Sequence, residues 1–547
     1  MFWILSVSGL LVFIIFLLLR IRNERQRKIS EKIRSSWGKP KKEPLPFDRI
    51  GRYAEVMVRK DGFHQLSTQT MDDIDFYDLF TFLDRTSSSV GQQYLFLKLL
   101  RPVDDLDSLK VLDAKADLLG SSPAAREAIQ KELRRLNTSG AYFITSLLEE
   151  KNFGKPKWLK YLPLSLVVLL VLFLLGLKNP IFFILMVIPL SANVIIHYWH
   201  RESIYQLSKS FPQLNLLIDV AEKVLAKDRH LKREVINESL LYLKPFQWKL
   251  EMLAFANDGG MRDELSQAGI YVAELIRGFL LIEVFVSLHV IKELQLKRAC
   301  ILTLFNYVGE IDTAISVASV RAGGLKTCIP DFMKNSKELK TRGVYHPLLK
   351  NCVKNDLVIS SKSILITGSN MSGKSTFLRT VIINSILAQT IYTCFADEFS
   401  TPFLRQFSSI RLDDSLQKGT SYFFEEVNLM GAMIRESEAG VQGIFFLDEV
   451  FKGTNTVERV AAAKAILSYL NQENNIVVVS THDLELATML DNEYDLYHFS
   501  EVFDNGEYQF DHKLKPGAMR TGNAIKILSR ANYPEEIIRE ALSLSKR

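Results

Sequence analysis

The chain has 547 residues, of which 47% are hydrophobic and 24% are charged, and its formal net charge is +6. This composition excludes a disordered chain and a wholly membrane-embedded one, and the length is typical of about three or four domains. A net charge this small does not by itself indicate nucleic-acid binding. The four cysteines are scattered without a Cys-x-x-Cys pair, which argues against a metal or disulfide framework and fits a reducing compartment.

The first predicted element is an uncharged apolar segment at residues 2–19, long enough to span a bilayer as a helix. A cleaved signal peptide has its basic stretch before the apolar core. Here the basic residues follow the core: Arg20, Arg22, Arg25, Arg27 and Lys28. We therefore expect an uncleaved transmembrane anchor at residues 1–20, with the N-terminus outside and the basic flank in the cytoplasm. Residues 21–66 are polar and contain three prolines, so we interpret them as a basic linker.

Apolar residues spaced three and four apart predict a first helical part at residues 67–160. Two apolar segments follow, at 161–177 and 181–199, and Lys178-Asn179-Pro180 between them suits a tight turn. We predict a transmembrane hairpin over residues 161–199, with both flanks in the cytoplasm because basic residues lie on both sides. A buried helical hairpin is the alternative, although a soluble core helix seldom stays apolar on every face for this length.

Residues 200–330 are predicted to be almost entirely helical, as the second part of the helical domain. A dense apolar stretch runs from Leu275 to Ile291 within this region. Acidic and basic side chains at Arg277 and Glu283 interrupt it. We therefore interpret this stretch as a packed core helix and not as a further span.

Short apolar strands alternate with helical patterns in the last domain, residues 331–547. This order is typical of a mostly parallel sheet with helices on both faces. The four expected strands are at residues 364–367, 408–412, 443–447 and 476–480. Asp504-Asn505-Gly506 is a hairpin turn signal, so we expect an antiparallel pair to close the sheet.

A phosphate-binding pattern, Gly-x-x-x-x-Gly-Lys-Ser, lies between the first of these strands and a predicted helix. Glycines let backbone N–H groups turn toward phosphates, and a helix N-terminus adds partial positive charge. Lys374 can reach the β- and γ-phosphates, and the Ser375 hydroxyl can bind Mg²⁺. A chance match in a Gly/Ser loop is the alternative. The predicted nucleotide-binding residues are Gly368, Ser369, Asn370, Met371, Ser372, Gly373, Lys374, Ser375 and Thr376.

Polar residues follow two other predicted strands. Asp448 can support Mg²⁺ and Glu449 can orient and deprotonate water, although an isolated acidic pair at a strand end is usually only solvated. His482, after the next strand, can contact the γ-phosphate or the water, and a helix-capping turn is an equal alternative. Ser421, before another helix, is either an N-terminal cap or a second phosphate contact, in its own subunit or in a partner's.

Together these motifs resemble those of the MutS family of DNA mismatch-repair ATPases. The loop Thr367–Thr376 differs from the family's Thr-Gly-Pro-Asn-Met-x-Gly-Lys-Ser-Thr only at Ser369, where the family has proline. The stretch Asp448–Thr454 fits the family's Asp-Glu-x-x-x-Gly-Thr, and Thr481-His482 fits its Thr-His pair. Further similar positions are Gly419, Ser421, Phe423 and Glu426; His346-Pro347-Leu348; Phe82 to Thr86 with Gly91; Leu100-Arg101-Pro102; and Glu310-Ile311-Asp312 with Ala318. The resemblance covers roughly residues 70–150 and 300–547.

The resemblance implies an α/β P-loop ATPase domain of the ABC type next to an all-α core and lever domain, using ATP and Mg²⁺. It implies that Lys374 and Ser375 bind the phosphates and Mg²⁺, with Asp448 supporting the metal. The resemblance also implies that Glu449 activates water and that His482 lines the γ-phosphate. Ser421 completes the site of the opposite subunit, which implies a homodimer.

The resemblance makes DNA the default partner, with two departures. First, only residues 1–66 precede the core, and they do not contain the Phe-x-Glu motif with which the family reads mismatches. Second, a predicted membrane hairpin occupies the interval of the core in which the family has its DNA clamp. We therefore expect a multi-pass membrane protein with three transmembrane helices, a cytoplasmic ATPase domain and a dimeric MutS-like ATPase. The alternatives are a membrane ATPase that has lost DNA binding and acts on a protein or lipid, and a nucleotide switch that does not hydrolyse.

Overall fold

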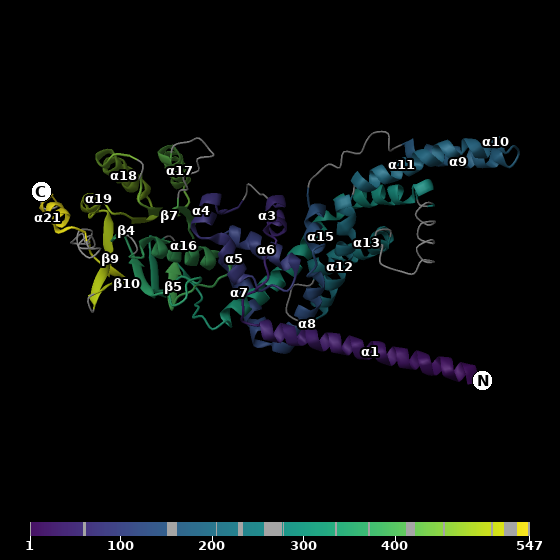
Figure 1. Cartoon of the computed structure of the whole chain (residues 1–547), viewed down its shortest axis with the longest axis horizontal. Coiled ribbons are helices and arrows are strands. Elements are labelled where there is room, and N and C mark those ends of the chain that lie inside the picture. The colour runs from purple at the N-terminus through teal and green to yellow at the C-terminus, as the bar shows by residue number, and fades with distance from the viewer. Residues whose placement is uncertain are drawn as a thin grey trace.

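A computed structural model describes most of the chain. The residues outside the description are 1, 58–61, 150–160, 204, 228–233, 256–275, 277, 334–335, 370–371, 412–421, 452–453, 505–506, 519–532 and 545–547. An α/β domain lies at one end, a helical body lies in the middle, and two sets of helices extend from the other end (Figure 1).

The N-terminal helix α1 (Phe2–Ser36) has 35 residues and runs without a break through the expected boundary at residue 20. The expected linker also contains α2 (Phe47–Ile50) and α3 (Arg52–Val56). Ile33, Ile50 and Tyr53 are buried. These few apolar side chains pack a polar stretch onto the helical body, so much of residues 21–66 is folded structure and not a free linker.

The helical body is formed by two sets of helices. The first set is α4 (Thr68–Asp73), α5 (Phe76–Leu83), α6 (Ser89–Leu100), α7 (Leu106–Ser121), α8 (Pro123–Leu133) and the 3₁₀ helices Arg134–Leu136 and Ala141–Leu147. The second set is α12 (Tyr205–Lys227), α13 (Glu234–Phe255) and α15 (Ile282–Arg321). The 40-residue helix α15 packs against α6, α7 and α13, so it is the central rod of the body.

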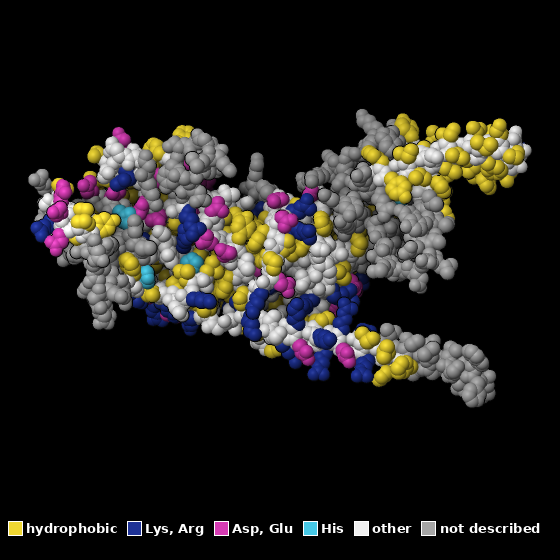
Figure 2. All heavy atoms as spheres, in the orientation of Figure 1, with side chains coloured by type: hydrophobic (Ala, Val, Ile, Leu, Met, Phe, Trp, Pro, Cys, Tyr) yellow, Lys and Arg dark blue, Asp and Glu magenta, His cyan; other side chains and the backbone are white. Residues whose placement is uncertain are grey.

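A helical hairpin extends from the body (Figure 1). It consists of α9 (Leu162–Gly176), α10 (Ile181–Leu185) and α11 (Val187–Ser203). Apolar side chains cover the visible face of its outer part (Figure 2). The turn at Lys178-Asn179-Pro180 separates α9 from α10, as expected.

Two helices in the described part of the chain are long and apolar enough to cross a membrane, Ile181–Trp199 and Val284–Arg321. The second is mostly buried, in agreement with a packed core helix. The apolar helix Leu162–Gly176 is shorter, because the turn at Lys178 ends it early. Three transmembrane helices are therefore not supported. Of the three expected spans, only 181–199 meets the length criterion, and most side chains of residues 2–19 lie outside the description.

The α/β domain contains a six-stranded sheet of order β10-β9-β4-β8-β7-β6. Its strands are β4 (Ser363–Thr367), β6 (Arg405–Ser409), β7 (Gly443–Asp448), β8 (Ile476–Ser480), β9 (Tyr494–Asp504) and β10 (Glu507–Pro516). Strands β9, β4, β8, β7 and β6 pair in parallel, and β10 pairs antiparallel to β9. The central strands β4 and β8 are buried at every position, as expected for apolar strands covered on both faces.

Helices of the α/β domain follow the expected alternation. They are α16 (Lys374–Thr390), α17 (Tyr422–Ser437), α18 (Thr456–Leu470), α19 (Leu484–Met489) and α21 (Glu535–Leu544). A second sheet, of order β1-β5-β2-β3, was not predicted. It contains β1 (Asp331–Phe332), β2 (Leu339–Val344), β3 (Asn355–Ile359) and β5 (Glu398–Thr401). The α/β domain and the helical domain are thus confirmed, with an extra sheet beside the main one.

Candidate functional site

The glycines of the phosphate loop adopt backbone conformations that other residues rarely reach. Gly368 has φ +149° and Gly373 has φ +112°. A Cβ atom on Gly368 would lie 2.8 Å from the carbonyl oxygen of Phe499. Helix α16 begins directly after Gly373, and its first turn has no acidic residue. The loop therefore leads into a helix N-terminus whose N–H groups and dipole favour an anion.

The Lys374 ammonium is buried within this loop. Its Nζ donates to the carbonyl oxygens of Gly368 at 2.7 Å and of Ser369 at 2.9 Å. The Ser369 Oγ is also buried, and within the described residues it has no hydrogen-bond partner. A buried cation and an unsatisfied hydroxyl beside a helix N-terminus fit a phosphate group. Two other predicted loop residues, Asn370 and Met371, lie outside the described residues.

A Ser–Asp pair joins the first turn of α16 to the main sheet. The Ser375 Oγ donates to the Asp448 Oδ2 at 2.5 Å. The other carboxylate oxygen of Asp448 accepts a hydrogen bond from the Ser480 hydroxyl. Because β7 and β8 are parallel and pair Asp448 with Ser480, their carboxyl ends meet at this edge. The structure thus brings together the hydroxyl and the carboxylate predicted to hold Mg²⁺.

The residue after Asp448 has a strained backbone. Glu449 has φ +56°, a conformation uncommon outside glycine, and its N–H donates to the carbonyl oxygen of Ser480 at 2.9 Å. Its carboxylate contacts the Nε2 of His482, and both side chains are partly buried. The structure therefore pairs the predicted base with the predicted histidine. Such strain is typical of functional sites.

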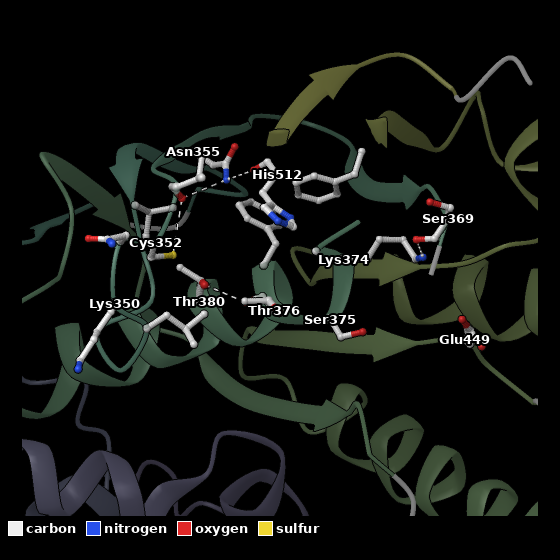
Figure 3. A pocket seen from close by; sticks show the side chains of 17 residues that line it. Lys350, Cys352, Asn355, Ser369, Lys374, Ser375, Thr376, Thr380, Glu449 and His512 are labelled. Carbon is white, nitrogen blue, oxygen red and sulfur yellow. Dashed lines mark hydrogen bonds between the residues drawn. The ribbon is translucent and has the colours of Figure 1, made fainter. Parts of the chain in front are cut away.

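A cavity of about 410 Å³ opens beside Lys374, Ser375 and Thr376. Figure 3 shows Lys374 reaching toward Ser369, with His512 and Glu449 on opposite sides of it. The remaining predicted loop residue, Ser372, donates through its Oγ to the carbonyl oxygen of Ser369 at 2.8 Å. The cavity thus continues from the phosphate loop toward a second wall.

Sequence patterns did not predict that second wall. It includes Phe499 from β9, His512 from β10, and Cys352 and Asn355 from the loop before β3 and its first residue. The His512 Nδ1 donates to the Ser372 carbonyl oxygen at 3.0 Å, and the Asn355 Nδ2 donates to the His512 carbonyl oxygen at 3.0 Å. A hairpin signal placed β10 beside the sheet, but no local motif marked its histidine.

Two further expectations concern the surroundings of the site. The predicted trans contact Ser421 lies outside the described residues. Glu426 of the same motif is buried and accepts a hydrogen bond from the N–H of Phe451, which ties α17 to the turn after Glu449. Within the described residues, no group of three or more His, Cys, Asp or Glu side chains could hold a metal ion alone.

Comparisons with known proteins agree with this geometry. Residues 364–547 match the family model of MutS domain V. The DNA mismatch repair protein MutS of Lactobacillus helveticus is 31% identical over 257 residues, which cover 45% of this chain and 30% of that protein. The protein of the same name from Thermus thermophilus is 28% identical over 239 residues, covering 43% of this chain and 28% of the relative. The matched region thus spans less than a third of these relatives.

Proposed function

We propose that the chain binds ATP with Mg²⁺ and hydrolyses it, through the residues 364–547 that match the family model of MutS domain V. The proposal rests on one observation, which is that the predicted functional side chains lie together at one edge of the sheet. The Lys374 ammonium, the Ser375–Asp448 pair and the Glu449–His482 pair all lie at the carboxyl edge of the parallel strands. Ligands of open α/β sheets bind at this edge.

Each of these side chains has a chemical role in the proposal. Lys374 and the N–H groups of the loop bind the phosphates, while Ser375 and Asp448 are the protein ligands of Mg²⁺. When bound, Mg²⁺ neutralises charge on the phosphate oxygens. Glu449 orients the attacking water and accepts its proton, and His482 holds the Glu449 carboxylate in place.

The second wall of the cavity suits the base of the nucleotide. The rings of Phe499 and His512 line a site that continues from the phosphate loop. The Asn355 side chain fixes the strand segment that carries His512 through a hydrogen bond at 3.0 Å. This arrangement supports a nucleoside triphosphate in preference to inorganic phosphate.

The direct test of binding is a titration of the purified full chain with ATP and Mg²⁺. Lys374→Ala should weaken affinity by about tenfold or more, because it removes a buried charge from the phosphates. The matched control is Lys464→Ala, on α18, where the ammonium pairs with Glu493 at 3.2 Å away from the cavity. Equal affinities for the two variants would contradict the proposed site.

We propose a homodimer in which Ser421 completes the partner's site, in line with the family resemblance. Exposed apolar side chains on the same domain support an interface, since Phe424 is 55% exposed and Val457 is 79% exposed. The test mixes two inactive variants, Lys374→Ala and Ser421→Ala. With a trans contact, each mixed dimer regains one intact site, so activity returns to at most about a quarter of wild type. With a contact in cis, mixing restores nothing.

We further propose that the hairpin and the apolar end of α1 attach the chain to a membrane, with the ATPase domain in the cytoplasm. The supporting observation is the exposure of large apolar side chains around the hairpin, such as Leu170 at 59% and Ile188 at 70%. The hairpin and α1 also extend in the same direction, away from the α/β domain (Figure 1).

A charge test examines this attachment. The double variant Leu170→Glu with Ile188→Glu places two carboxylates on the apolar surface, at a cost of about 3 kcal/mol each in a bilayer centre. We expect the full chain to leave the carbonate-resistant membrane fraction. Val111→Glu, at an exposed apolar position of α7, is the matched control. An unchanged distribution of the double variant would contradict attachment through the hairpin.

DNA is the proposed partner because the relatives are DNA mismatch repair proteins by name. The rival is a protein or lipid partner, which the exposed hairpin favours. Binding to duplex DNA should weaken steeply as salt rises if phosphates are contacted. No binding at low salt, with and without ATP, would favour the rival.

A further inference from the structure

The carboxyl end of α15 and the two residues after it, Ser319–Gly323, form a junction between the N-terminal helix and the segment that follows the nucleotide-binding helix. The N–H of Gly38, just beyond α1, donates to the Ser319 Oγ at 3.0 Å. Two residues further along α15, the Arg321 guanidinium donates to the Tyr392 carbonyl oxygen at 3.1 Å and to the Thr393 Oγ1 at 3.0 Å. Segments far apart in the sequence therefore meet on one helical turn.

The carboxyl end of α1 and the residues after it are attached to the helical body beside this junction. Arg34 pairs with Glu127 of α8 at 2.8 Å, and the centroid of the Trp37 ring lies 3.6 Å from the Arg126 guanidinium carbon. Lys41 pairs at 2.8 Å with Asp84, whose side chain is fully buried. A continuous helix of 35 residues is about 50 Å long. The carboxyl end of this helix is therefore fixed to the helical body beside Gly38, while its apolar end extends away from the body.

Helix α16 connects the same junction to the phosphate loop. It begins at Lys374, ends at Thr390 and is buried along most of its length. Arg321 binds Tyr392 and Thr393, the two residues that follow the C-cap of this helix, and its Nη1 also pairs with Asp113 at 2.7 Å. Tyr392, just after the helix, has φ +52°. The segment that follows α16 therefore contains a strained residue whose carbonyl oxygen is held by the Arg321 guanidinium.

The hairpin is tied to the other end of α15. The Asn193 Nδ2 of α11 donates to the Phe279 carbonyl oxygen at 2.8 Å. Leu281, with φ +51°, and Val284 pack against Leu162 of α9 in a small buried cluster. Both groups of apolar helices that extend from the body therefore bear on α15, one at each end.

We propose that the Ser319–Gly323 turn couples membrane attachment to the nucleotide site, so that insertion of α1 and the hairpin into a lipid bilayer changes the affinity of the chain for ATP. The proposal rests on the proposed function, because it assigns a regulator to that site. The regulator is the bilayer, and the path runs from Gly38 through Arg321 to α16.

The test compares one dissociation constant in two environments. The full chain is purified in detergent, and part of it is placed in lipid nanodiscs of phosphatidylcholine and phosphatidylglycerol. The Kd of a non-hydrolysable ATP analogue with Mg²⁺ is measured in both. We expect the two values for the wild type to differ by about fivefold or more, as is usual for coupled sites.

Variants at the junction should remove this difference while binding persists. Gly38→Ala puts a Cβ 3.1 Å from the Ala322 carbonyl oxygen, at φ +77°. Gly440→Ala is the matched control, since φ is +71° there but no atom lies within 4 Å of the added Cβ. Arg321→Gln removes the contact with Tyr392 and Thr393, just after α16. Thr393→Val, a nearly isosteric change, serves if Arg321→Gln does not fold.

The expected result is a ratio near one for the junction variants and the wild-type ratio for Gly440→Ala. Equal wild-type affinities in detergent and nanodiscs would overturn the coupling and leave the proposed function intact. So would junction variants that keep the wild-type ratio. Absence of nucleotide binding in both environments would instead overturn the proposed function, and the coupling with it.

Discussion

The Ser375 hydroxyl donates to the Asp448 carboxylate at 2.5 Å, which joins the first turn after the phosphate loop to the end of β7. The two residues are 73 positions apart, and only the parallel sheet brings them together. The contact matters chemically because a hydroxyl and a carboxylate at this spacing are the protein ligands that nucleotide-bound Mg²⁺ uses.

Changing this pair should alter the magnesium requirement. Asp448→Asn keeps the shape of the side chain and removes its charge, so the Mg²⁺ concentration for half-maximal ATP turnover should rise by about tenfold or more. A magnesium titration of turnover by the purified full chain measures this. Asp495→Asn, on β9, is the control variant. An unaltered magnesium dependence in Asp448→Asn would remove Asp448 from the metal site.

Acid should destabilise the chain through two buried histidines. Burial lowers the pKa of His64 from 6.5 to about 4, and burial together with Arg379 lowers the pKa of His346 to about 4. Between pH 6.5 and 4, these two histidines bind protons in the unfolded chain but not in the folded chain. Their contribution to stability is therefore fully present above pH 6.5 and is lost as the pH falls toward 4.

Urea unfolding at several pH values tests this sign. His64→Gln keeps a donor for the Gln406 carbonyl oxygen, which the His64 Nε2 now contacts at 2.8 Å. The variant should lose roughly half of the pH dependence that the two histidines cause between pH 6.5 and 4. A variant with the full wild-type slope would show that His64 does not titrate in this way.

Replacing a helical glycine by alanine should lower the stability of the chain at one position and not at another. A Cβ on Gly91 of α6 would lie 2.2 Å from the Asp312 Oδ2, and that carboxylate is buried and accepts hydrogen bonds from Ser87 and Ser88. Gly91→Ala should therefore destabilise the chain by about 2 kcal/mol or more. Gly120→Ala in α7 meets only an ordinary contact at 3.7 Å, so it should be neutral or stabilising. The unfolding midpoints of the two variants test this prediction. Similar midpoints for both variants would contradict the packing at Gly91.

Local signals predicted the part of the site that is contiguous in sequence. The strand before Gly368 and the helix after Lys374 form where the apolar pattern placed them, because buried parallel strands and helices have distinct periods. Asp448 and Glu449 follow their strand for the same reason. The Ser421 contact stays a prediction, because Ser421 lies outside the described residues.

The rest of the cavity depends on tertiary contacts that no local pattern encodes. His512 meets Ser372 across 140 positions, and Asn355 meets His512 across 157. The second sheet was missed because its strands are short, with two residues in β1 and four in β5. Similarly, the polar composition of residues 21–66 concealed the few apolar side chains, such as Ile50, that fold it onto the body.

The measurement that tests the account most directly is ATP hydrolysis by the Glu449→Gln variant of the purified full chain. The amide keeps the size of the side chain and cannot accept the proton of the attacking water. Phosphate release with Mg²⁺ should fall by about a hundredfold or more, while the Kd for ATP stays within a few-fold of wild type. A variant that hydrolyses ATP at the wild-type rate would contradict the assignment of Glu449, and with it the proposed hydrolytic site.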